Sequence, residues 1–410
     1  MRILLLTPYP AYPPHGGGVQ RMYHFIRQLS QHHDIWCLSL SPSAEASAAA
    51  QPLAQWCHLT LMPAPRRTLT QRAITTLISP LPDMALRAPS ATFRTALETM
   101  LNTMQFDVVL AESIEMAQYA VHAKRFGAWA ALDQWNAEYV LQQRAAQTDA
   151  KHPKKWHGAL YSWIQWQKLA RYEREVCNQL DAVYVVSHED AASLQKIGIT
   201  KPLTVIPNGV DTAHFALHAE RDHDPECLLF TGTLDFRPNV DAMTWFVHEV
   251  LPLIQRERPQ AHLQIVGRAP TPAVQALAQQ RGVHVVGSVP DVRPYFAQAA
   301  VYVLPMRIGG GVRLKLLEAL ATATPLVSTT MGADGVIGLR DRNHCLLADS
   351  PLAFAHAVLH LMHERAYAVK LATTGQHLAH HAYDWASIVA NLEDSWHQLD
   401  ATTAKHYNPA

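Results

Sequence analysis

The strongest constraint on the fold is a short apolar run followed by a glycine triplet and a helix, which occurs twice. Residues 3–6 form an apolar run, and residues 19–29 carry apolar side chains at helical spacing. The same order returns where residues 301–304 precede a helical segment that starts near Val312. The glycine triplets are Gly16, Gly17 and Gly18 in the first half and Gly309, Gly310 and Gly311 in the second. Each half therefore predicts a strand, a glycine loop and a helix.

Further apolar runs alternate with helical segments along the whole 410-residue chain, and a polar stretch at residues 220–225 interrupts them. Alternating strands and helices predict parallel sheets with helices on both faces. We therefore expect an α/β protein with one domain at residues 1–215 and a second at residues 216–383. Residues 384–410 begin with apolar side chains at helical spacing, which predict a helix that packs across a domain surface.

The composition excludes two classes of protein. Lys and Arg number 34, as do Asp and Glu, so no basic excess indicates a nucleic-acid partner. Hydrophobic residues make up 49% and charged residues 17%, which excludes a disordered chain. No stretch approaches the roughly 20 apolar residues of a membrane-spanning helix, and the first apolar run is too short for a signal peptide. We expect a soluble, cytoplasmic protein.

The Cys and His residues do not predict a metal site. The five cysteines are odd in number and dispersed, with no Cys-x-x-Cys pair, which indicates reduced thiols. His356, His360 and His363 would share one helix face. Two interpretations of that face are a metal site and a solvated surface. No established zinc-ligand spacing is present, so we favour the solvated face and expect no metal.

The second glycine loop carries the strongest sign of an anion site. Consecutive glycines cost roughly 0.5–1 kcal/mol each in an ordered chain, which implies close approach of the backbone to another group. Arg313 and Lys315 follow in the first helical turn, where the macrodipole disfavours cations and a bound phosphate would reverse that effect. Glu318, one turn further, suits ribose hydroxyls. A tight turn with ordinary surface charges is the alternative, and these residues alone leave it open.

Short motifs extend this pattern over nearly the whole chain. They are Val-Val-Ser187, Ile-Pro-Asn208-Gly209-Val-Asp211, Phe-Thr-Gly232, Ile-Val-Gly267-Arg268, Val-Gly287-Ser-Val-Pro-Asp291 and Leu-Leu-Glu318-Ala. In this order they resemble the retaining GT-B glycosyltransferases of glycosyltransferase family 4. The loop Arg-Ile-Gly-Gly-Gly-x-Arg-Leu-Lys resembles a subgroup of group 1 sugar transferases associated with exopolysaccharide gene clusters. The resemblance implies two Rossmann-like domains facing a central cleft, and a C-terminal helix that crosses back to the first domain.

The resemblance also implies transfer of a sugar from a UDP- or GDP-sugar to a glycan or lipid-linked acceptor. The first domain would hold the acceptor and the second the donor. The implied donor-binding residues are Gly232, Arg237, Arg268, Gly309, Gly310, Gly311, Val312, Arg313, Lys315 and Glu318. The implied acceptor residues are Gly16, Gly17, Gly18, Asp133 and Asn136, the last two of which also suit capping of a helix near Trp135. The implied catalytic residues are Glu112, Arg313 and Lys315, which act without a metal cofactor.

Two positions depart from the family pattern. Relatives carry a glutamate eight residues before Glu318, where this chain has Gly310, and a basic residue where it has Thr233. Arg237 or Arg268 is expected to replace that basic residue. We favour altered sugar specificity, because the subgroup shares the change at Gly310. A nucleotide-sugar 2-epimerase of the same fold and a non-catalytic partner of a second transferase stay open.

One region of the first half combines basic and apolar side chains. Its members are Arg66, Arg67, Leu69, Arg72, Ile74, Leu77, Ile78, Leu81 and Arg87. A lobe near lipid and a helix packed on its own domain are both open interpretations, and Pro80, Pro82 and Pro89 argue against one long amphipathic helix. If this region is a lobe near lipid, we expect the protein to associate peripherally with the inner face of the cell membrane.

Overall fold

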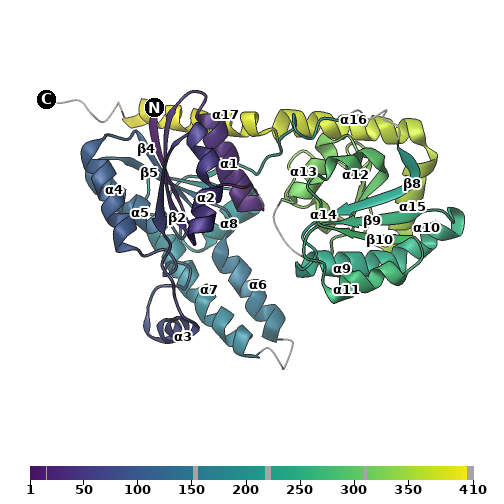
Figure 1. Ribbon diagram of the computed structural model, residues 1–410, viewed down its shortest axis with the longest axis horizontal. Helices are drawn as coiled ribbons and strands as arrows, with labels where there is room; N and C mark the ends of the chain where they lie inside the picture. The colour runs from purple at the N-terminus through teal and green to yellow at the C-terminus, as the bar shows by residue number, and fades with distance from the viewer. Residues whose placement is uncertain (15, 151–155, 218–222, 309–311, 404–410) are drawn as a thin grey trace. The chain divides into compact units, whose positions relative to one another are not determined.

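The computed structural model describes residues 1–14, 16–150, 156–217, 223–308 and 312–403. The chain divides into two compact units, Met1–Pro207 with Val389–Ala410 and Asn208–Ile388, and each is described by itself (Figure 1). The second unit begins at Asn208, whereas we predicted that it would begin at residue 216. The reason is that Val210 N donates to the Tyr383 carbonyl oxygen at 2.7 Å and the Thr212 hydroxyl donates to the Asp384 carboxylate. These bonds join the segment after Pro207 to the end of the second unit.

The first unit is built on a seven-stranded parallel sheet with the strand order β3-β2-β1-β4-β5-β6-β7. Its central strands are apolar and buried, as expected for a parallel sheet covered on both faces. Figure 1 shows α4 and α5 on one side of this sheet and α1 on the other. The strands are β1 Arg2–Thr7, β2 Asp34–Ser41, β3 His58–Pro63, β4 Val108–Glu112, β5 Trp129–Gln134, β6 Ala182–Val185 and β7 Leu203–Val205.

The helices of the first unit begin where the sequence offers caps and apolar periodicity. They are α1 Gly17–Leu29, α2 Ala44–Ala49, η1 Gln51–Gln55, α3 Leu69–Ile78, α4 Ala91–Thr103, α5 Ala117–Ala123, η2 Lys124–Phe126, α6 Glu138–Ala150, α7 Trp156–Cys177 and α8 His188–Lys196. Ser43, Ser90 and Ser187 accept hydrogen bonds from the first-turn amides of α2, α4 and α8.

The second unit is built on a six-stranded parallel sheet with the order β10-β9-β8-β11-β12-β13. Its strands are β8 Asp224–Thr231, β9 His262–Val266, β10 Val283–Gly287, β11 Ala299–Leu304, β12 Leu326–Ser328 and β13 Leu346–Leu347. Its helices are α9 Arg237–Trp245, the π-helix η4 Phe246–Val250, α10 Leu251–Glu257, α11 Pro272–Ala276, η5 Leu277–Gln279, α12 Arg293–Gln298, α13 Leu314–Ala321, α14 Thr330–Ala333, α15 Pro351–His363 and α16 Arg365–Ala382. The predicted alternation of strands and helices is confirmed in both units.

The last helix, α17 (Trp385–Thr403), starts in the second unit and continues into the first. Its later part is tied to the first unit, where His33 Nε2 lies 2.7 Å from Glu393 Oε1 and the Tyr184 and Ser395 hydroxyls lie 3.0 Å apart. Trp385 and Trp396 are buried, as their helical spacing predicted.

Two glycines bring the ends of β8 and β9 unusually close. Gly232 and Gly267 both have φ of +155°, a backbone conformation that L side chains rarely adopt. A Cβ added to Gly267 would overlap the carbonyl oxygen of Gly232, and one added to Gly232 would lie 2.5 Å from Lys315 Nζ. The backbone turn after β8 therefore has space for neither side chain.

We expect Gly267→Ala to lower the free energy of unfolding by about 3 kcal/mol or more, because backbone strain and a backbone clash add. Gly287→Ala is the matched control, since Gly287 has φ of +84° but open space around a Cβ. Its loss should be about 1–2 kcal/mol from strain alone. Denaturant unfolding measures both, and equal losses would contradict the close approach described here.

Candidate functional site

Each sheet reverses its strand order at one point, and polar side chains gather there. In the first unit the reversal lies between β1 and β4, and in the second it lies between β8 and β11. Ligands of open α/β sheets bind outside the carboxyl ends of the strands at such points. The residues that follow these four strands are therefore the candidates for function.

In the second unit Lys315 lies at the carboxyl end of β8. Its Nζ donates to Asn239 Oδ1 at 2.7 Å and lies 4.5 Å from the centroid of the Phe230 ring. Asn239 Nδ2 in turn donates to the Thr233 carbonyl oxygen at 2.8 Å, which fixes the amide. The ammonium group is thus held beside Gly232, in the turn that directly follows the strand.

Burial lowers the pKa of Lys315 to about 7, although the Glu318 carboxylate partly offsets this. Burial likewise raises the pKa of Glu318 to about 7, and Lys315 opposes that rise. Both groups are only half-charged near neutral pH, because desolvation penalises their charged forms. An anion bound here would raise the pKa of Lys315 and restore its full charge.

Arg313 is the N-cap residue of α13, which begins at Leu314. We predicted its start near Val312, two residues earlier. Burial lowers the pKa of the Arg313 guanidinium, and the charge of Asp334 opposes the change. Gly309, Gly310 and Gly311 lie outside the described residues. Lys315 therefore lies in the first turn of the helix, as the sequence predicted, whereas Arg313 directly precedes that turn.

The other predicted donor residues lie on neighbouring loops. Arg237 is exposed at the start of α9, and Arg268 is exposed in the turn after β9, where its carbonyl oxygen accepts from Leu234 N at 2.8 Å. Sequence reasoning missed Asn239. Asn239 lies on the same helix face as the apolar residues Ala242, Met243 and Phe246. A polar residue on an apolar helix face was the signal that could have identified it.

In the first unit a buried ion pair lies beside the strand reversal. Arg21 Nε and Nη2 donate to the two carboxylate oxygens of Asp133 at 2.6 and 2.7 Å, and both side chains are almost completely buried. Arg21 Nη1 also donates to the Pro207 carbonyl oxygen at 3.0 Å. We predicted an acceptor contact for Asp133, but its burial makes it a structural partner of Arg21.

Glu112, at the end of β4, is also fully buried. Trp135 Nε1 donates to its Oε2 at 3.1 Å. Burial, followed by the negative charge of Asp133, raises the pKa of Glu112 well above its usual range, and Arg21 only partly opposes this. Burial and the neighbouring carboxylate thus favour the protonated form of Glu112. We predicted that Glu112 contacts the reacting sugar, but in this structure its side chain is fully buried and is bonded to Trp135.

The first glycine triplet makes space for the same tryptophan. A Cβ on Gly18 would lie 2.6 Å from the Trp135 ring, so the ring packs directly on the backbone of α1. Gly16 precedes the helix with φ of +103°, and Gly17 is its first residue. Gly18 thus allows the backbone of α1 to pack closely against an aromatic ring.

Asn136 and Glu138 lie next to Trp135 and are partly exposed. Asn136 Nδ2 donates to Glu138 Oε1 at 3.2 Å, and burial raises the pKa of Glu138 to about 7. The N-terminus of α6 is capped by Glu173 of α7, which accepts from Glu138 N at 2.8 Å and from Tyr139 N at 3.2 Å. The alternative role of Asp133 and Asn136 as helix caps is therefore wrong, and Asn136 keeps an exposed side chain.

Two family models match the chain. "Glycosyltransferase Family 4" matches residues 15–214, and "Glycosyl transferases group 1" matches residues 225–364. The chain belongs to the family 4 type of GT-B glycosyltransferases. A curated protein of Klebsiella pneumoniae, described as an uncharacterized 44.6 kDa protein in the cps region, is 22% identical over 360 residues, which cover 86% of this chain and 88% of that protein.

Solved structures share the fold of this glycosyltransferase. Sucrose-phosphate synthase from Thermosynechococcus elongatus is 16% identical, with a TM-score of 0.69 over 98% of this chain and 100% of that one. Anabaena HepE, solved in complex with UDP and glucose, is 12% identical, with a TM-score of 0.64 over 96% and 98% of the two chains. These likenesses confirm the predicted GT-B fold.

Two further observations concern metals and membranes. Among the described residues, no three His, Cys, Asp or Glu side chains gather as a metal site would require. His356, His360 and His363 are exposed on α15, as predicted. Within the same part of the chain, no helix combines the length and apolar character needed to cross a bilayer.

We expect Arg21→Met to lower the free energy of unfolding by about 3–5 kcal/mol, because Asp133 would remain buried without its cation next to Glu112. Arg171→Met is the matched control, since Arg171 is exposed and pairs with Glu175 at 2.8 Å along one helix. Its loss should be small, because an exposed ion pair is screened by water and contributes little to stability. Urea unfolding of both variants measures the two losses of unfolding free energy. Similar losses would contradict a larger contribution of the buried pair to stability.

Proposed function

We propose that this protein is a retaining glycosyltransferase that moves a hexose from a UDP- or GDP-sugar to a glycan or lipid-linked acceptor during synthesis of an exopolysaccharide or other envelope polysaccharide. The observation that carries the proposal is the ammonium group of Lys315 beside the Gly232 turn at the strand reversal of the second unit. The UDP in the HepE structure and the cps region of the Klebsiella relative support the donor and the pathway class.

The donor diphosphate would lie at the first turn of α13. Breaking the sugar–phosphate bond places negative charge on the leaving diphosphate and positive charge on the sugar ring. Lys315, Arg313 and the free amides of the helix N-terminus would stabilise the leaving group, a contribution of about 3–4 kcal/mol when one such donor is lost. Glu318, one turn deeper, would accept hydrogen bonds from the ribose hydroxyls.

The acceptor would attack from the same face as the leaving group, with the diphosphate oxygen taking its proton. This route retains the configuration of the sugar and asks for neither a protein nucleophile nor a metal. The acceptor would lie in the first unit over Trp135, with Asn136 and Glu138 in reach of its hydroxyls. Glu112 then acts as a positioning residue, because it contacts Trp135 and not the sugar.

We expect at least one sugar of a UDP- and GDP-sugar panel to raise the melting temperature of the purified protein. Lys315→Met should weaken that sugar roughly 10- to 100-fold, because a charge-assisted hydrogen bond to phosphate contributes about 1.5–3 kcal/mol. Arg313→Ala should weaken it similarly. Titration calorimetry measures the affinities, and Lys370→Met, an exposed lysine of α16, is the control.

Three outcomes separate this proposal from its alternatives. Failure of every nucleotide sugar to bind would exclude the proposed donor site. Conversion of the donor sugar to an epimer without any acceptor, followed by NMR, would favour the epimerase. Binding without release of nucleotide with any acceptor, together with co-purification of a second transferase, would favour a non-catalytic subunit.

We expect affinity for the bound UDP- or GDP-sugar to fall as the pH rises above about 7, by up to tenfold per pH unit. The reason is that the pKa of Lys315 in the free protein is lowered to about 7, so the neutral amine must take up a proton when the diphosphate binds. Below pH 7 the ammonium is already present and the affinity should level off. A sugar-linked diphosphate does not itself titrate in this range.

The pH profile is measured by calorimetry in buffers of different ionisation enthalpy, which also counts the protons taken up. Lys315→Met should remove the proton uptake by the amine as well as weaken binding, and any dependence on pH that remains belongs to Glu318, whose pKa is raised to about 7. A wild-type affinity that stays constant from about pH 6 to 8.5 would contradict the assignment of Lys315 to the diphosphate.

We also propose that the protein works at the cytoplasmic surface of the membrane, where a lipid-linked acceptor would be available. The support comes from the apolar and basic side chains near α3.

A further inference from the structure

Helix α3 presents its apolar side chains to solvent. Leu69 is 80% exposed, Leu77 76% and Ile78 75%, whereas Thr76 is buried against the rest of the unit. An amphipathic helix on a soluble protein normally buries its apolar face. Here the polar threonine is inside and the leucines and isoleucines are outside, which is the reverse of that arrangement.

Specific hydrogen bonds hold α3 in this orientation. Lys168 Nζ of α7 donates to the carbonyl oxygens of Thr76 and Ser79, both at 2.6 Å. Gln165 Nε2, also from α7, donates to the Thr76 hydroxyl at 3.2 Å, and its Oε1 accepts from Asp83 N at 2.8 Å. The outward apolar face is therefore fixed by polar contacts on the inward side.

A buried carboxylate adds to this anchoring. Asp83, just after α3, accepts from Arg67 Nη1 at 2.8 Å and from Arg72 Nη2 at 2.9 Å. Arg67 precedes the helix, and Arg72 lies within it. Only 3% of the Asp83 side chain is exposed. Charge pairing inside the segment thus keeps both arginines near the base of the helix while its leucines point outward.

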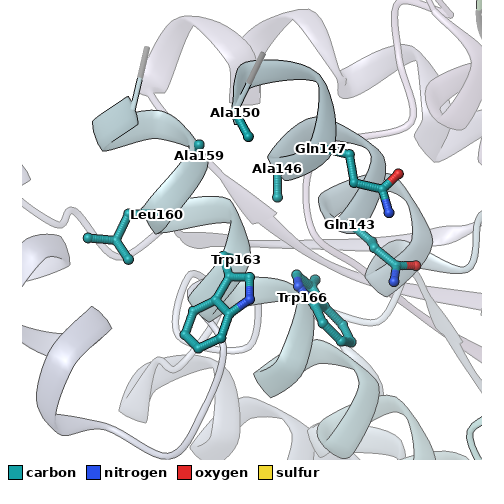
Figure 2. A pocket seen from close by; sticks show the side chains of 8 residues that line it. All are labelled: Gln143, Ala146, Gln147, Ala150, Ala159, Leu160, Trp163 and Trp166. Atoms are coloured by element: carbon teal, nitrogen blue, oxygen red, sulfur yellow. The ribbon is translucent and has the colours of Figure 1, made fainter. Parts of the chain in front are cut away.

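Helix α7 contacts α3 through Gln165 and Lys168 and has exposed apolar side chains on another of its faces (Figure 1). Trp156, Leu160 and Trp163 are each about half exposed on the first half of α7. Figure 2 shows Leu160 and Trp163 at a pocket between α6 and α7, which small alanines and the Trp166 ring also line; its volume is about 470 Å³. The apolar side chains of α3 and those of α7 therefore form two separate patches.

The side chains around α3 have an excess of positive charge. Arg66, Arg67, Arg72 and Arg87 lie there with the carboxylates of Asp83 and Glu115, which pair with the last three of these arginines, so four positive charges face two negative ones. An exposed apolar helix face beside such an excess is complementary to anionic lipid headgroups. A second copy of the chain would place like charges against each other, which disfavours self-association through this face.

We propose that the outward face of α3 is a docking surface for an anionic lipid bilayer. Leu69, Leu77 and Ile78 enter the headgroup region, and Arg66 meets the lipid phosphates. This inference rests on the proposed membrane-surface function and names the part of the first unit that makes the contact. It is independent of which donor sugar the second unit binds.

Co-sedimentation of the full-length protein with sucrose-loaded vesicles tests the proposal. The vesicles contain phosphatidylcholine alone, or phosphatidylcholine and phosphatidylglycerol in equal parts. We expect clear binding to the mixed vesicles, weaker binding at high salt and little binding to the neutral ones. The double variant Leu77→Glu, Ile78→Glu should reduce the partition coefficient roughly tenfold or more.

Leu352→Glu is the matched control, because Leu352 is 57% exposed on α15 of the second unit. It should bind vesicles like the wild type. Circular dichroism and the thermal shift by nucleotide sugar show whether each variant is folded and whether the donor site is intact. Loss of vesicle binding with an unchanged thermal shift therefore concerns the docking surface alone.

Two results would overturn the proposal. One is wild-type protein that binds mixed and neutral vesicles equally or not at all. The other is a dimer in light scattering that the Leu77→Glu, Ile78→Glu variant dissociates, which would assign this face to a second copy of the chain.

Discussion

Lys315 holds an ammonium group at the end of β8 with an amide oxygen as its hydrogen-bond acceptor, and the candidate donor site depends on this arrangement. The close approach of Gly232 and Gly267 leaves space for the group, and Asn239 fixes its position. Burial lowers the pKa of Lys315 to about 7, and the Glu318 carboxylate opposes that shift. A negatively charged group bound beside Lys315 would favour its ammonium form.

The first unit resolves a different electrostatic conflict. Two carboxylates, Asp133 and Glu112, are buried near one cation, Arg21. Arg21 bonds both oxygens of Asp133, and burial together with that carboxylate raises the pKa of Glu112. Oε2 of Glu112 accepts from Trp135, whose ring packs on Gly18, whereas Oε1 is buried without a hydrogen-bond partner among the described residues. The Trp135 ring is therefore held by both a buried carboxyl group and a helix backbone.

Much of the fold and part of the site follow from the sequence. Apolar runs and helical spacing predicted the parallel sheets, the helix after the second glycine triplet and the burial of Trp385 and Trp396, because burial on both faces requires apolar strands. Arg313, Lys315 and Glu318 could be placed because they are close in sequence. Asn239 could not, since its contact with Lys315 joins segments from different parts of the unit. Glu112 and Asp133 were placed at a surface, although both are buried, because a strand pattern does not tell which polar side chain is covered by its neighbours.

The sequence by itself determined the α/β architecture, the family resemblance and the cluster of charges at the start of α13, because these depend on local spacing and composition. The tertiary structure alone decided which charges are paired, which carboxylates are buried and which face of α3 points outward. Residues 69–78 have the same helical pattern whether their leucines pack inward or face solvent. Lys168, Gln165 and Asp83 select the second arrangement, through hydrogen bonds and ion pairs that form only when distant parts of the chain come together.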